Sequence, residues 1–135
     1  MSLIASLSAW LKEFDGGVIT TDIMLMQTPA RSISASSTGT AIVDVLGNRE
    51  YTNNYIFRLR SLSIDEADRV ENNDVIEQLT RWVYNRNDDG DYPILEYGVV
   101  EDIKVTNAVL STINEDGTTE YEVLLAVKIF EKRRG

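Results

Sequence analysis

Oxygen-bearing side chains between positions 85 and 96 have the spacing of a calcium-binding loop. Positions 1, 3, 5, 6 and 12 of the EF-hand pattern are occupied by Asn85, Asn87, Asp89, Gly90 and Glu96. This spacing wraps oxygens around one ion, with glycine at the bend and a bidentate glutamate at the end. However, asparagine at the first position removes a charge, Pro93 stiffens the loop, and no helical pattern follows it. We therefore favour a solvated connection between a helix and a strand, with calcium binding as the alternative.

Carboxylates are the other groups that could support catalysis, and adjacent pairs occur at Asp88/Asp89, Glu101/Asp102 and Glu115/Asp116. General acid–base catalysis needs carboxyl groups whose pKa values are held apart by a pocket, whereas these pairs are typical of solvated loops. The chain has no Cys and no His. Thiolate nucleophiles, imidazole bases and thiolate zinc sites are therefore excluded. We expect no enzymatic activity, no catalytic residue, no cofactor and no metal.

The charge of the chain is strongly acidic and unevenly placed. Its 135 residues include 13 Lys and Arg against 22 Asp and Glu, a net charge of −9. Acids and bases balance up to Leu62, and the stretch from Asp65 to Glu77 holds six acids and one Arg. This balance argues against binding to a nucleic-acid backbone, which favours basic surfaces. No apolar run approaches the ~20 residues of a membrane helix, and a chain without disulfides suits a reducing cytoplasm.

The spacing of apolar residues predicts the helices and strands that carry these polar and charged side chains. A chain of this length is typical of one domain, here residues 1–135. Apolar residues recur every three or four positions from Leu3 to Phe14, which predicts a helix capped by Ser2 and ended by Asp15-Gly16-Gly17. A strand is predicted over Val18–Met26, and Ser32–Ser36 could pair with it weakly. Two further strands, Gly39–Leu46 and Tyr51–Leu62, flank the turn Gly47-Asn48.

A second helix is predicted to follow the capping box Ser63-Ile64-Asp65-Glu66 and to end near Asn85, with a break possible at Asn72-Asn73. The last third predicts a hairpin of Val99–Ile113 and Thr119–Phe130 around an acidic glycine-containing loop. Together these elements predict an α+β fold, an antiparallel or mixed sheet packed by an N-terminal and a central helix.

Two groups of charged residues are candidate interface residues. Arg58 and Arg60 share the face of their strand that is opposite Phe57 and Leu59. We interpret them as cross-strand salt-bridge partners on a solvated face, with an interface role as the alternative. The acidic candidates open the central helix: Asp65, Glu66, Asp68 and Glu71.

Several segments, taken in order, resemble a known family. They are the N-terminal helix ending in Trp10-Leu11, Tyr55-Ile56-Phe57-Arg58-Leu59-Arg60-Ser61, the run from Asn72 to Val83 with Glu77 and Trp82, a glycine loop, and Tyr92-Pro93-Ile94-Leu95. This order is similar to that of the tail terminator proteins of siphophages and prophages, also labelled phage minor capsid proteins. The shared residues are packing and turn residues, so none transfers as catalytic.

The resemblance implies a virion protein, made in the bacterial host cytoplasm, that forms a hexameric ring. Such a ring caps the tail tube, contacts the tube protein and the head connector, and lets DNA pass without specific binding or membrane contact. Lumen carboxylates would repel the DNA phosphates. Two alternatives remain open: a head-completion (minor capsid) protein, and a small acidic protein-binding or regulatory module.

Overall fold

The computed structural model describes residues 2–24, 29–39, 41–62 and 66–133. Its elements, in chain order, are α1 (Leu3–Lys12), β1 (Thr20–Thr21), β2 (Ala30–Thr38), β3 (Ile42–Val43), β4 (Arg49–Leu62), α2 (Glu66–Asp88), β5 (Val99–Ile113) and β6 (Thr118–Glu131). Two helices and one sheet confirm the predicted α+β fold. Within the described ranges, neither helix combines the length and apolar character needed to cross a bilayer.

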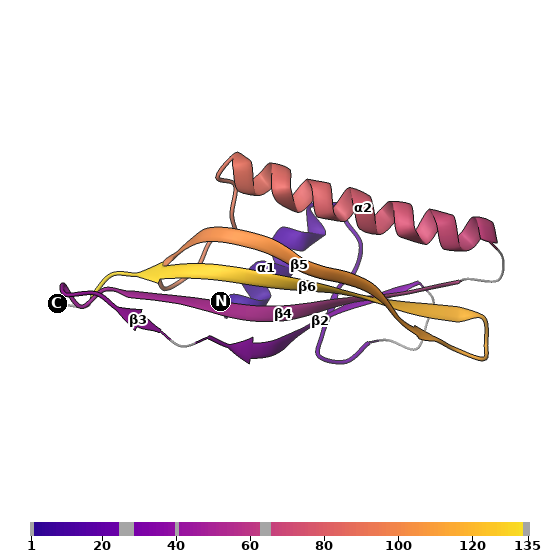
Figure 1. Ribbon diagram of the computed structural model, residues 1–135, viewed down its shortest axis with the longest axis horizontal. Coiled ribbons are helices and arrows are strands. Elements are labelled where there is room, and N and C mark those ends of the chain that lie inside the picture. Colours follow the sequence, from indigo (N-terminus) through magenta and orange to yellow (C-terminus); the bar gives the residue numbers. More distant parts are fainter. Residues whose placement is uncertain (1, 25–28, 40, 63–65, 134–135) are drawn as a thin grey trace.

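The described strands form one mixed sheet in the order β1-β2-β4-β6-β5, with β3 also paired to β4 (Figure 1). All pairs are antiparallel except β1 with β2, which is parallel. The long strands β4, β5 and β6 run along the length of an elongated molecule (Figure 1). The turn between β3 and β4 and the C-terminal end of the chain lie at one extremity, and the tip of the β5–β6 hairpin lies at the other (Figure 1).

The core lies between the helices and one face of this sheet. Alternate residues of β6 are almost completely buried: Tyr121, Val123, Leu125, Val127 and Ile129. They form one apolar cluster with Leu7 and Leu11 of α1 and with Leu79 and Val83 of α2. Since successive side chains of a strand point to opposite faces, both helices cover the same face of the sheet. The opposite face is formed by half-buried polar and apolar side chains of β4 and β6.

The N-terminal helix forms as its sequence predicts. The Ser2 Oγ accepts a hydrogen bond from the Ala5 N–H at 3.3 Å, and Gly16, with a positive φ of 75°, follows the helix end. The buried face of α1 brings Trp10 against Trp82 of α2, with ring centroids 4.6 Å apart. The two helices are thus joined to each other as well as to the sheet.

The central helix differs from its prediction at Asn72-Asn73, where no break occurs: α2 is continuous from Glu66 to Asp88. The Asn73 Nδ2 donates to the Arg69 carbonyl oxygen at 2.9 Å, so this side chain bonds within the helix instead of opening it. The helix also extends past Asn85, and Gly90, with a φ of 68°, follows its end. Residues 63–65 of the predicted capping box lie outside the described residues.

Two of the predicted strands are wrong in length. Of Val18–Met26, only Thr20–Thr21 is a strand among the described residues, because Asp22 adopts a positive φ of 64° and turns the chain. Of Gly39–Leu46, only Ile42–Val43 pairs with β4 among the residues that the structure describes. Conversely, the weak partner Ser32–Ser36 is part of the nine-residue strand β2.

Candidate interaction surfaces

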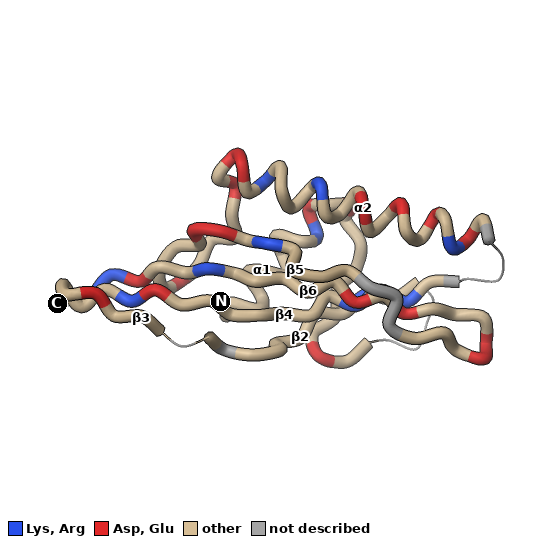
Figure 2. The backbone as a smooth tube through the Cα atoms, in the orientation of Figure 1, with Lys and Arg blue, Asp and Glu red and all other residues tan. Residues whose placement is uncertain are grey.

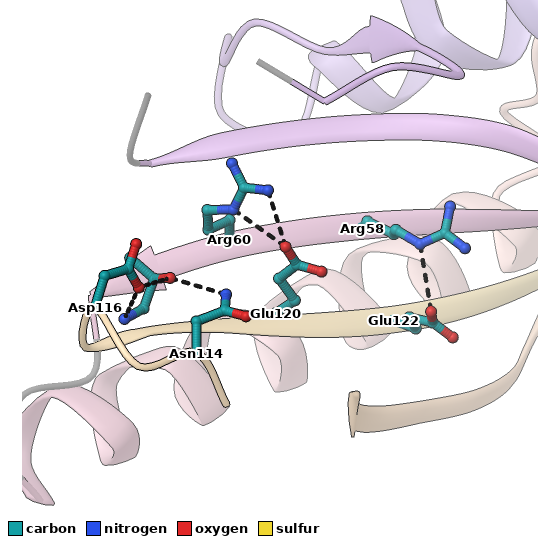
Figure 3. A network of polar contacts seen from close by, with 7 residues as sticks. Arg58, Arg60, Asn114, Asp116, Glu120 and Glu122 are labelled. Carbon is teal, nitrogen blue, oxygen red and sulfur yellow. Dashed lines mark hydrogen bonds and ion pairs between the residues drawn. The ribbon is translucent and has the colours of Figure 1, made fainter. Parts of the chain in front are cut away.

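The first candidate surface is the sheet face opposite the helices, where two ion pairs join β4 to β6. Arg58 Nε lies 3.3 Å from Glu122 Oε1, and Arg60 Nη2 lies 2.9 Å from Glu120 Oε1 (Figure 3). The strand register places each arginine directly opposite its glutamate, and the predicted cross-strand salt bridges are confirmed. Arg58 Nη1 also donates to the Ser34 Oγ on β2 at 3.1 Å. The face therefore presents paired charges on β4 and β6, and a hydroxyl of β2 accepts a hydrogen bond from one of the arginines.

The acidic candidates lie elsewhere. Asp68 and Glu71 are on the first turns of α2, which covers the other face of the sheet, so the structure separates them from Arg58 and Arg60. Glu66 is the first residue of α2, its side chain not being described, and Asp65 lies outside the described residues. Figure 2 shows acidic residues spaced along α2. The predicted interface residues thus belong to two surfaces.

The segment with calcium-loop spacing serves to join the end of α2 to β5. The Asn87 Oδ1 accepts hydrogen bonds from the Tyr92 hydroxyl at 2.7 Å and from the Ile103 N–H at 3.0 Å. Arg86 forms ion pairs with Asp91 and with Glu13 of the N-terminal segment. Burial and nearby carboxylates raise the pKa of Tyr92, which keeps its hydroxyl protonated as a donor. Among the described residues, no group of three or more acidic side chains has a metal-binding arrangement.

A second candidate surface is a cleft of about 830 Å³ at the end of the molecule that carries the β3–β4 turn. Its lining comes from three segments far apart in the sequence: Gly47 and Arg49, Glu96 to Val99, and Phe130 to Arg133. Sequence patterns did not reveal this cleft, apart from the Gly47-Asn48 turn at its border.

Two glycines shape the floor of this cleft. Gly47 has a φ of 87°, and a Cβ there would lie 2.8 Å from the Arg133 Cδ. Gly98 has a φ of 82°, and a Cβ there would lie 2.6 Å from the Phe130 carbonyl oxygen. Both positions therefore favour glycine for their backbone conformation, and Gly98 also for the close approach of the β6 backbone. The Arg133 N–H donates to the Asn48 Oδ1 at 2.9 Å, which ties the two segments together.

Basic side chains exceed acidic ones around the cleft, in contrast to the chain as a whole. Arg49, Lys132 and Arg133 line it together with Glu96 and Glu131. The Tyr51 hydroxyl donates to Glu131 Oε1 at 2.5 Å, and burial together with this carboxylate raises the pKa of Tyr51 to about 12. The tyrosine thus stays protonated and occupies one oxygen of Glu131.

Large apolar side chains are exposed on the segments that frame the cleft. They lie on the β3–β4 hairpin and just before or at the start of β5: Ile42, Val43, Val45, Leu46, Tyr97 and Val99. Tyr97 and Leu46 are 74% and 68% exposed. Clustered exposed apolar side chains with a polar rim are typical of protein–protein contact sites.

The tip of the β5–β6 hairpin has the opposite electrostatic character. Glu115 and Asp116 are exposed, and Ile113 is 70% exposed beside them. Hydrogen bonds close the turn. The Asn114 N–H donates to the Thr118 carbonyl oxygen at 2.9 Å. The Asp116 Oδ1 accepts from the Thr118 hydroxyl at 2.6 Å (Figure 3). These bonds from Thr118 hold the pKa of Asp116 below its usual range, so the tip stays negatively charged.

No protein-family model matches the sequence, and no curated protein is detectably similar to it. A solved structure does share the fold, a chain of the "Virion of native gene transfer agent (GTA) particle". The two chains superpose with a TM-score of 0.57 at 9% sequence identity, over 94% of this chain and 90% of that one. At this identity the similarity shows that the protein has the fold of that virion chain.

Proposed function

We propose that this protein is a structural component of a phage-like particle, and specifically a tail terminator. In this role its copies form a hexameric ring on the end of the tail tube, stop further addition of tube protein and contact the head connector. Residues 1–135 act as one domain in this assembly. DNA passes through the ring without specific binding.

The observation that carries this proposal is the fold similarity to a gene transfer agent virion chain, because it spans nearly all of both chains. It agrees with the order of segments that resembles tail terminators. The two lines of support differ in kind, since one compares backbone geometry and the other compares residue identities.

The surfaces also suit an assembly protein. The cleft end exposes apolar side chains and basic groups, whereas the hairpin tip and α2 expose acids. Protein contacts of this kind gain affinity from the apolar centre and orientation from the charges around it. A net charge of −9 also disfavours adhesion of DNA to the walls of a ring through which it slides.

The test is to delete the gene from a strain that produces the particle and to measure the tails by electron microscopy. A terminator stops tube growth, so its loss gives tubes longer than those of the parent strain, without attached heads. Supplying the intact gene in trans restores the parental length.

The two alternative functions predict different micrographs. A head-completion protein leaves tubes of parental length beside unattached heads. An acidic regulatory module leaves complete particles and alters only their number. Either of these outcomes would remove the tail terminator assignment.

A further inference from the structure

The two ends of the molecule are complementary in charge and in apolar character. We propose that the tip of the β5–β6 hairpin of one copy docks into the cleft formed by the β3–β4 turn, residues 96–99 and the end of β6 of a second copy. The proposal deepens the proposed function and rests on it in one respect, namely that copies of this chain assemble into a ring.

The cleft supplies a hollow with cations at its border. Its volume of about 830 Å³ is lined by Tyr97, Val99 and Phe130. Arg49, Lys132 and Arg133 lie around these apolar groups together with Glu96 and Glu131, so bases exceed acids by one. A side chain at position 98 would collide with the Phe130 carbonyl oxygen, and one at position 47 would displace the Arg133 side chain. An apolar hollow with a basic border fits an acidic segment that carries an exposed apolar residue.

The hairpin tip has these properties. It is two strands wide, about 4.8 Å from strand to strand, so it forms a narrow projection. Glu115 and Asp116 supply the charge, and Ile113 supplies the apolar group. The hydrogen bonds of Asn114 and Asp116 within the turn hold the tip in one conformation, which lowers the entropy lost on docking.

The positions of the two surfaces make the contact one between different copies. The tip and the segments that line the cleft, namely the β3–β4 turn and the end of β6, lie at opposite ends of the elongated molecule (Figures 1 and 2). Neither surface therefore reaches its counterpart within one chain. A contact between two different surfaces repeats from copy to copy and closes into a ring when the rotation between copies permits it. The excess of bases at the cleft and the acids of the tip therefore favour a second copy as the occupant.

Pairing through the edge of the sheet is a weaker route to assembly. The register of β5 against β6 shifts at three places, between Val100 and Asp102, between Val105 and Asn107, and between Leu110 and Thr112. Such irregularities bend an edge strand and interrupt the regular row of backbone groups that another strand would need. A contact between the tip and the cleft does not require a regular row of backbone groups.

The absence of cysteine from the chain allows a direct crosslinking test. A full-length Glu115→Cys variant is mixed with a Lys132→Cys variant, the mixture is oxidised, and the disulfide-linked heterodimer of the two variants is quantified by mass spectrometry. Both positions are exposed, so both variants are expected to fold. Asp116 on the tip and Arg49 and Arg133 at the cleft keep their charges in these variants. In the control mixture, Lys132→Cys is replaced by Gln78→Cys, which is exposed on α2. Docking raises the local thiol concentration, and we expect roughly tenfold more heterodimer than in the control.

A charge reversal tests the electrostatic part of the contact. Adding Arg133→Glu to the Lys132→Cys copy is expected to lower the heterodimer yield about two- to fivefold, the effect of losing one exposed ion pair. Arg81→Glu in the same copy, on the exposed side of α2, makes the same charge change away from the cleft and is expected to leave the yield unchanged. Equal yields from the Lys132→Cys and Gln78→Cys mixtures, or equal losses from the two reversals, would overturn the proposal.

The outcomes separate this contact from the proposed function. Overlong tubes in the deletion strain together with control-level crosslinking mean that the protein is a terminator whose copies meet through other surfaces. Specific crosslinking together with tubes of parental length means that the contact is correct and the terminator function is wrong.

Discussion

Among single residues, Asn87 has the most consequential polar contacts outside the core. Its Oδ1 accepts from the Tyr92 hydroxyl and from the Ile103 N–H, so it joins the end of α2 to the loop and to β5. Replacing it with alanine leaves the Ile103 N–H without this acceptor. We expect Asn87→Ala to lower the free energy of unfolding by about 1–3 kcal/mol, measured by urea denaturation.

Asn85 provides the matched control for this prediction. It lies two residues earlier in the same helix and is exposed, so Asn85→Ala should change the free energy of unfolding by less than about 0.5 kcal/mol. If both residues instead held calcium, each substitution would abolish a calcium-dependent rise in stability. Equal effects of the two substitutions would show that the contacts of Asn87 do not stabilise the fold.

The ion pair between Asp15 and Arg31 makes part of the stability dependent on acid pH. Arg31 Nη1 lies 2.5 Å from Asp15 Oδ1 and joins the turn after α1 to β2, and this hydrogen bond lowers the pKa of Asp15 below its usual 3.8. A carboxyl group whose pKa is lowered by folding stabilises the fold above its unfolded pKa, and this contribution disappears as the pH falls through the folded value.

We therefore expect Asp15→Asn to cost about 0.5–1 kcal/mol at pH 7, the range for a partly exposed pair. The difference between the variant and the parent protein should shrink steadily below about pH 4. Thermal unfolding followed at several pH values measures it. A difference that stays constant down to about pH 2, well below the unfolded pKa, would mean that the effect does not come from the charge of Asp15. The bond from the Gly17 N–H to Asp15 Oδ1 is not the cause in either case, because the Oδ1 of asparagine can also accept it.

Prediction from sequence succeeded for residues of a strand, where the alternation of side chains decides which face of the sheet each one lies on. The alternation in Tyr55–Arg60 correctly placed Arg58 and Arg60 opposite the core and made acidic residues on a neighbouring strand their expected partners. The role of Asn87 escaped prediction, because its spacing from Asp89 and Gly90 matches a calcium loop while its contacts depend on where β5 lies. Local spacing does not contain that information.

At the scale of elements, glycine conformation controls how the segment before β5 meets the end of β6. Gly98 has a positive φ, and its missing Cβ leaves room for the Phe130 carbonyl oxygen, whereas Gly90 has a positive φ with open space around it. We expect Gly90→Ala to cost about 1–2 kcal/mol from the backbone conformation alone. Gly98→Ala should cost about 1–3 kcal/mol more, because the added methyl group collides with backbone.

The pair of glycine variants thus separates conformational strain from steric crowding. Chemical denaturation of both proteins gives the two free energies. Equal losses of free energy of unfolding would mean that β6 can move away from position 98 without destabilising the protein. The backbone at the floor of the cleft would then be able to shift.

The accuracy of the element predictions follows the strength of the local signal. The β5–β6 hairpin was predicted almost to the residue, because two long runs of strand-forming residues flank a glycine-containing turn. Val18–Met26 has equally β-prone residues, yet Val18 and Ile23 are exposed and only two of its described residues pair. The side-chain preferences of this segment predict a strand, but a strand also needs a partner to pair with. The positive φ of Asp22 ends β1 after Thr21.

At the scale of the whole molecule, sequence patterns predicted the fold class but not the cleft. The fold class follows from the order of helices and strands, and each of these elements can be predicted from its own stretch of sequence. The cleft is formed by residues near positions 47, 97 and 131, which only the completed sheet brings together. Surfaces of this kind depend on long-range geometry, and no periodicity in one segment indicates them.

The single apolar core predicts that residues 1–135 unfold as one unit. Leu7 of α1, Leu79 of α2 and Phe57 of β4 belong to the same buried cluster, and Trp10 contacts Trp82 between the helices. Separating either helix from the sheet exposes core residues of both, so neither the helices nor the sheet have a core of their own. Small domains built in this way unfold in a single cooperative transition.

Tryptophan fluorescence reports on the helix pair, and far-ultraviolet circular dichroism reports on the sheet and helices together. We expect the two thermal transitions to coincide, with a heat capacity change of about 1.6–2.0 kcal/mol/K for 135 residues. A Trp82→Phe variant, which leaves Trp10 as the only tryptophan, should give the same coincidence at a lower midpoint. A fluorescence transition that precedes the circular dichroism change would instead show that the helices detach from a sheet that is stable without them.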